Sequence, residues 1–120
     1  MEALLLQDFT TVRGTASTQV IQPSYGCLDL GELEDIVLYT DVRETLPNAK
    51  MTFETAPAPT DAAFVTLVPQ FILATGLRTD SMFASLANVP VARFLRWRLS
   101  GDANPWDATF RVWVAAYGWS

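Results

Sequence analysis

The chain has 120 residues, of which 50% are hydrophobic and 18% are charged, and its formal net charge is −5. This length and composition predict one folded domain, and an acidic chain with a single lysine is a poor candidate for nucleic-acid binding. With no histidine and one cysteine, the chain lacks the usual zinc ligands and the usual general base, so we expect no metal, no cofactor, no catalytic residues and no enzymatic activity.

The first twelve residues carry an apolar run and no basic flank. The run Ala3–Leu6 is far too short to cross a bilayer, and no signal-peptide pattern is present, so we expect no membrane association and synthesis in a cytoplasm. Residues 1–12 are interpreted either as an edge strand of the domain or as an arm that docks on a neighbouring subunit. The apolar residues of such an assembly arm are Leu4, Leu5, Leu6 and Phe9.

The rest of the chain reads as short strands separated by turn residues. The candidate strands are Ser17–Gln22, Gly26–Leu30, Asp35–Arg43, Lys50–Thr55, Ala63–Leu67, Gln70–Ala74, Met82–Leu86, Val91–Leu99 and Thr109–Tyr117. Turn signals include Pro69 and Gly76. Short strands with a turn every eight to twelve residues are typical of sandwiches, so we predict an all-β fold: a single-domain β-sandwich or jelly roll of about eight antiparallel strands over residues 1–120.

Two late segments, Val91–Leu99 and Ala108–Tyr117, alternate with period two and are predicted to pair with each other. Each has one aliphatic face, which we expect in the core, and one face that mixes arginine with aromatic side chains. The mixed faces form the chief candidate for a partner-binding stripe, because arginine and aromatic residues are typical interface anchors. The predicted stripe consists of Phe94, Arg96, Arg98, Arg111 and Trp113. The alternative is an exposed sheet face whose arginines pair with Glu34, Asp41 or Glu54 on adjacent strands.

Two further clusters carry weaker signals. One loop gathers an aromatic ring with hydrogen-bonding side chains, which suits sugar stacking but equally suits an ordinary turn. Its residues are Asp102, Asn104, Trp106 and Asp107. An earlier acidic cluster lacks the ligand spacing of a calcium loop and is interpreted as a solvated turn. It consists of Asp29, Glu32, Glu34 and Asp35.

Charge is unevenly distributed along the chain. Ten of the thirteen acidic residues lie at or before Asp61, whereas five of the eight basic residues follow it. This asymmetry predicts an electrically two-sided molecule, which would favour directional contact with neighbours.

The segments Lys50–Thr60 (KMTFETAPAPT) and Val91–Gly101 (VARFLRWRLSG) resemble small β-sandwich proteins found in the structural-gene clusters of tailed phages. The resemblance implies a virion component, either a capsid decoration protein or a minor structural protein, assembled in the host cytoplasm. Its implied partners are the major capsid protein or another virion structural protein, together with further copies of itself in a homo-oligomer. The late strand is also similar to that of discoidin-like carbohydrate-binding modules, so glycan binding is the alternative function.

Overall fold

The computed structural model describes residues 2–23, 26–33, 35–46, 49–83, 91–102 and 104–118. Strands dominate these residues. They are β1 (Glu2–Gly14), β2 (Val20–Ile21), β3 (Leu28–Asp29), β4 (Asp35–Leu46), β5 (Lys50–Ala56), β6 (Val65–Ile72), β7 (Gly76–Met82), β8 (Phe94–Ser100) and β9 (Trp106–Tyr117), with a 3₁₀ turn, η2 (Asp61–Ala63), before β6.

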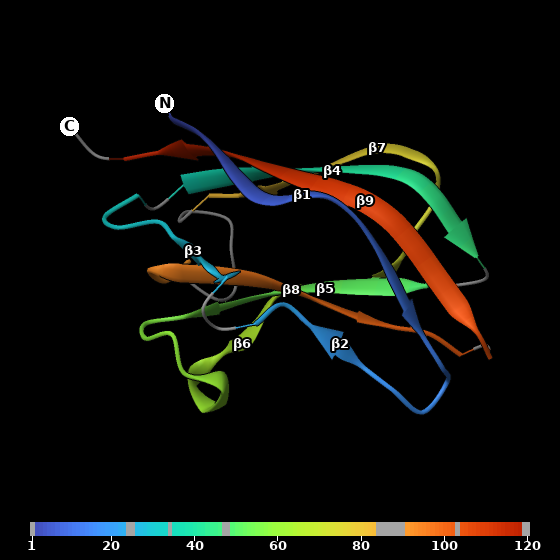
Figure 1. The fold of residues 1–120 in the computed structure, drawn as a ribbon. Coiled ribbons are helices and arrows are strands. Elements are labelled where there is room, and N and C mark those ends of the chain that lie inside the picture. Colours follow the sequence, from blue (N-terminus) through green and yellow to red (C-terminus); the bar gives the residue numbers. More distant parts are fainter. Residues whose placement is uncertain are drawn as a thin grey trace.

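The strands form two antiparallel sheets that pack face to face (Figure 1). The four-stranded sheet has the order β1-β9-β4-β7. The five-stranded sheet has the order β2-β8-β5-β6, and β3 also pairs with β8. This arrangement confirms the predicted all-β sandwich, with nine strands in the part of the chain that is described.

The core lies between the sheets and is made by the alternating inward residues of the long strands. On β4 these include Ile36 and Leu38, and on β8 they include Leu95 and Trp97. The Trp97 ring meets the Phe110 ring of β9 edge to face, with 5.3 Å between ring centroids, so this aromatic pair joins the two sheets. The predicted aliphatic faces of both late strands are therefore buried, as period-two alternation requires.

The predicted pairing of the two late strands is wrong. β8 pairs with β2, β3 and β5, whereas β9 pairs with β1 and β4 in the other sheet. Alternation identifies which face of a strand must be buried. It does not show whether two such strands lie side by side in one sheet or face each other across the core. Here the aliphatic faces of β8 and β9 meet across the core.

The predicted boundaries fail mainly at β6 and β7, which are edge strands of the two sheets. β6 is one strand that runs through Pro69, where a turn was expected. An edge strand tolerates proline because the ring's missing N–H can lie on the unpaired side. β7 begins at Gly76, a predicted turn residue, and ends at Met82, the first residue of a predicted strand. Of the predicted strand Met82–Leu86, residues 84–86 lie outside the described residues.

β1 is an edge strand of the four-stranded sheet and pairs with β9 along most of its length. Leu6 is buried, and Leu4 packs against the core. Of the two interpretations of this N-terminal segment, the edge strand describes residues 2–12 in this structure. The predicted strand Ser17–Gln22 shrinks to Val20–Ile21, and Gly26–Leu30 shrinks to Leu28–Asp29.

Candidate interaction surface on the four-stranded sheet

The five residues of the predicted stripe do not form one surface. Phe94, Arg96 and Arg98 lie on the outer side of β8, in the five-stranded sheet. Arg111 and Trp113 lie on the outer side of β9, in the opposite sheet. The predicted stripe requires β8 to pair with β9. Because these strands lie in opposite sheets of the sandwich, the five residues lie on two separate surfaces.

Arg96 cannot reach a partner, because its side chain is 3% exposed. Its Nε donates to the buried Glu54 carboxylate at 2.9 Å, and Nη1 donates to Asp61 at 2.7 Å. Its guanidinium also lies 3.9 Å from the centroid of the Phe64 ring. Asp61 and Phe64 belong to the connection between β5 and β6, so Arg96 holds this connection against the outer face of the five-stranded sheet.

The alternative interpretation, in which arginines pair with carboxylates of adjacent strands, matches the structure better. Glu54 on β5 binds both Arg96 and Arg98 of β8. Arg111 of β9 lies 3.5 Å from Asp41 of β4. Two of the three expected carboxylates are thus ion-paired, and the third, Glu34, lies outside the described residues.

The outer side of the four-stranded sheet carries a set of aromatic, apolar and arginine side chains. We call this set the aromatic face. It consists of Leu5 and Phe9 of β1, Tyr39, Asp41 and Arg43 of β4, Leu77 of β7, and Arg111 and Trp113 of β9.

Strand register places these residues in cross-strand rows. Leu5 and Tyr39 both lie opposite Trp113, on the two sides of β9. In a neighbouring row, Asp41 lies between Arg111 and Leu77. Side chains that face each other across antiparallel strands are close enough to pack together. The aromatic face therefore extends across all four strands of the sheet.

Two guanidinium groups lie against the Phe9 ring. The centroid of this ring is 4.5 Å from Cζ of Arg43 and 4.4 Å from Cζ of Arg111. Arg111 also lies 5.6 Å from the Trp113 ring. Each such contact contributes about 0.5–1 kcal/mol at an exposed site, and together they hold the arginines flat against apolar surface.

The aromatic face remains open to solvent at its apolar residues. Trp113 is 38% exposed, Leu5 is 40% exposed and Leu77 is 66% exposed. Tryptophan and arginine are the residue types that most often anchor protein interfaces. The arrangement thus suits binding to another protein.

Sequence reasoning found half of this surface and divided it between two sites. Arg111 and Trp113 were assigned to the stripe, whereas Leu5 and Phe9 were assigned to the assembly arm. The pairing of β1 with β9 brings these four residues together. Tyr39 and Leu77 belong to neither predicted site, although Tyr39 lies in the predicted strand Asp35–Arg43.

The loop considered for sugar stacking has no exposed tryptophan. Trp106 is 1% exposed, and its indole N–H donates to the Thr15 carbonyl at 2.9 Å. Gly101 allows this burial, because a Cβ there would lie 2.5 Å from the ring. The Asn104 side chain accepts a bond from the Ala16 N–H, so the loop residues bind neighbouring loops. The ordinary turn is therefore the interpretation that matches this loop, because the Trp106 ring is part of the core and is not available for stacking.

The acidic cluster is also used structurally. Asp29 accepts two hydrogen bonds from Arg93, at 2.8 and 2.9 Å, and these bonds hold the pKa of Asp29 below its ordinary value. The only cysteine, Cys27, is partly buried, and burial raises the pKa of its thiol. Within the described ranges, no group of three or more histidine, cysteine or acidic residues could hold a metal ion. The same ranges contain no helix with the length and hydropathy that a membrane span requires.

No protein-family model matches the chain, and no curated protein matches its sequence. Among solved structures, the chain is similar to the PBSX exported protein XepA, a phage protein, with 15% identity and a TM-score of 0.56. That alignment covers 99% of this chain and 38% of XepA. A subunit of Bacillus endospore appendages, a family of disulfide-linked pili, aligns with 19% identity and a TM-score of 0.44 over 100% of this chain and 93% of that one. The similarity to XepA is one of fold.

Proposed function

We propose that this chain is a non-enzymatic structural protein of a phage particle, either a capsid decoration protein or a minor structural protein. It attaches through the aromatic face to the major capsid protein or to another protein of the particle, and it associates with further copies of itself. Assembly takes place in the host cytoplasm, and the virion is its final location.

The observation that carries this proposal is the exposed aromatic face. Trp113 lies at its centre between Leu5 and Tyr39, with Arg111 beside it. A central aromatic residue surrounded by apolar and arginine side chains is the usual composition of an interface hot spot. The similarity of fold to XepA, a phage protein, supports the choice of a phage particle as the setting.

The proposal is tested by co-sedimentation with particles purified from the organism that encodes the chain. Trp113→Ala and Arg111→Glu should each weaken attachment by about 2 kcal/mol or more, or roughly 30-fold. Two matched controls should bind like wild type: Val65→Ala removes an exposed apolar side chain of β6 in the opposite sheet, and Arg93→Glu reverses an exposed, ion-paired arginine just before β8.

Thermal melting of each variant shows whether the fold is intact. Folded Trp113→Ala and Arg111→Glu proteins that sediment with particles as wild type does would contradict attachment through the aromatic face. A wild-type chain that never sediments with purified particles would contradict the virion role itself.

A further inference from the structure

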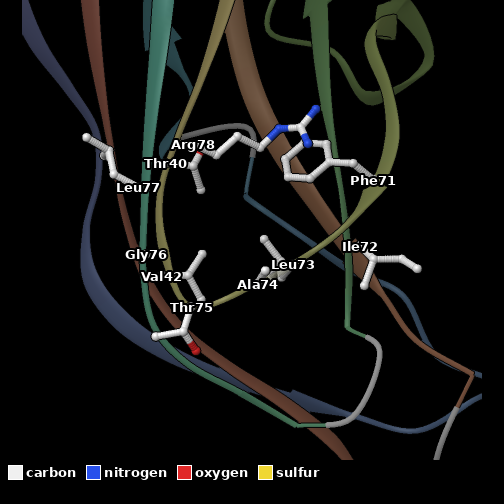
Figure 2. Close-up of a pocket in the computed structure, with 10 residues that line it drawn as sticks. All are labelled: Thr40, Val42, Phe71, Ile72, Leu73, Ala74, Thr75, Gly76, Leu77 and Arg78. Atoms are coloured by element: carbon white, nitrogen blue, oxygen red, sulfur yellow. The ribbon is translucent and has the colours of Figure 1, made fainter.

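Each sheet of the sandwich ends in two edges, and three of these edges are short or blocked. On one side of the molecule the edge strands are β6 and β7, joined by the crossover shown in Figure 2. Arg78 of β7 points inward, where it lies against the Phe71 ring of β6 and pairs with Asp80. β6 contains Pro69. Inward charges and proline hinder the addition of a further strand at an edge.

The opposite side of the molecule has one short edge and one long edge. There the five-stranded sheet ends in β2 and β3, which have two residues each. The four-stranded sheet ends in β1, which has 13 residues and contains neither proline nor lysine. β1 is thus the longest edge strand in the part of the chain that the structure describes.

The middle of β1 is not suited to pairing with another strand. Its register with β9 shifts twice between positions 5 and 10. In this stretch the Leu6 carbonyl accepts a hydrogen bond from the Gln22 side chain, and the Phe9 N–H donates to the Asp8 carboxylate. Regular pairing with β9 therefore leaves two runs of open edge, which we call the first run (residues 2–5) and the second run (residues 10–14).

The first run is the more apolar of the two. Its residues Ala3–Leu5 are all apolar, whereas Val12 is the only large apolar residue of the second run. Ala3 and Leu5 lie on the outer side of the sheet, and Leu5 is 40% exposed. In an antiparallel pair, alternate residues direct their N–H and C=O groups away from the partner strand. A strand added at the first run would therefore gain backbone hydrogen bonds and cover Leu5.

We propose that a second copy of this chain adds its own first run here, antiparallel, about a two-fold axis through Leu4. In this register Ala3 lies opposite Leu5 of the other copy, with both side chains on the outer side, as directly paired residues must be. Glu2 lies opposite Leu6 of the other copy, so like charges do not face each other. The pairing ends at Leu6, whose carbonyl is already hydrogen-bonded within the chain.

This inference rests on the self-association included in the proposed function and names the surface that carries it. A two-fold axis perpendicular to the sheet joins two four-stranded sheets into one sheet of eight strands. It also keeps both aromatic faces on the same side of that sheet. The pair of chains would therefore present one continuous attachment surface, and binding of the first chain to a particle would favour binding of the second.

Disulfide trapping of the purified chain in solution, without particles, tests the register. Each variant carries one new cysteine in a Cys27→Ser background. A mixture of Ala3→Cys and Leu5→Cys chains should form the mixed disulfide at least about tenfold faster than either variant forms its own dimer. The reason is that directly opposed residues have Cβ atoms about 5 Å apart, whereas diagonal neighbours are about 7–8 Å apart.

Thr11→Cys is the matched control, because Thr11 is an exposed residue of the second run on the same strand. Its mixture with Leu5→Cys should show no preference for the mixed disulfide. Ala3, Leu5 and Thr11 are all exposed, so the three variants should melt like the Cys27→Ser chain.

Hydrogen exchange of the unmodified chain gives a second readout that needs no variant. Amides of the first run should exchange more slowly at high than at low protein concentration, and those of the second run should exchange at the same rate in both. Equal rates of mixed and single-variant disulfide formation, an equal preference in the Thr11→Cys mixture, or concentration-independent exchange in the first run would each overturn the proposed pairing. These measurements use no particles, so the pairing can fail while attachment through the aromatic face stands, and the reverse.

Discussion

Arg96 and Arg111 lie in similar alternating sequences and have different surroundings. Arg96 is covered by the connection between β5 and β6 and binds two carboxylates, whereas Arg111 remains on an open sheet face beside aromatic rings. Alternation predicts that both arginines point away from the core. It does not predict whether a loop folds over one of them, because that depends on distant residues such as Asp61 and Phe64.

The buried ion pairs of Glu54 lead to a prediction about stability. Glu54→Ala should lower the free energy of unfolding by about 3–5 kcal/mol, because it leaves the buried Arg96 without its main partner. Chemical denaturation measures this loss. Glu44→Ala, which removes an exposed carboxylate of β4, should change stability by less than about 0.5 kcal/mol. Equal small effects of the two substitutions would show that the Glu54 pairs contribute little.

The pair Asp29–Arg93 predicts a pH dependence at the surface. The folded protein has the lower pKa at Asp29, so this pair contributes stability above the ordinary carboxyl value near 3.8 and loses it as pH falls through the lowered value. NMR titration of the Asp29 carboxyl carbon should give a pKa below 3.8, and Arg93→Gln should return it toward that value. An identical titration in wild type and Arg93→Gln would rule out Arg93 as the cause.

At the scale of elements, the sequence predicts strands well where one face is buried and poorly where neither is. β4 and β9 alternate between buried and more exposed positions along most of their length, and both are predicted from the sequence. Most of β7 is exposed, so it offers no alternation, and β6 contains a proline, which a strand accommodates at a sheet edge or beside a bulge. Residues of the aromatic face are predicted in two separate sites for a related reason. These residues meet through pairing between strands that are distant in the sequence, which the pattern within one strand does not predict.

The edge strand β1 can be tested with two adjacent leucines. Leu6 is buried against the core, whereas Leu5 is exposed on the aromatic face. Leu6→Ala should lower the free energy of unfolding by about 2–4 kcal/mol through loss of buried apolar volume, and Leu5→Ala should cost less than about 1 kcal/mol. Thermal or urea unfolding measures both. A free arm would make both substitutions harmless to stability, which would contradict the role of β1 in the sheet.

In the molecule as a whole, part of the uneven charge along the chain is used in ion pairs within the fold. Asp29 pairs with Arg93, Asp41 with Arg111, and Glu54 with Arg96 and Arg98. Each pair joins the acidic first half of the chain to the basic second half. The charge asymmetry therefore favours contacts between the two halves, and the expected electrical two-sidedness is reduced where these charges meet.

Hydroxyl-radical footprinting of the particle-bound chain tests the central claim, attachment through the aromatic face, most directly. Trp113 is exposed in the free chain and should be protected from oxidation on the particle by the partner that covers it. Phe94, on the outer side of the opposite sheet, should be oxidised equally in the free and the bound chain. We predict that Trp113 is protected and that Phe94 is not. Unchanged oxidation of Trp113 together with protection of Phe94 would place the attachment surface on the five-stranded sheet and contradict it.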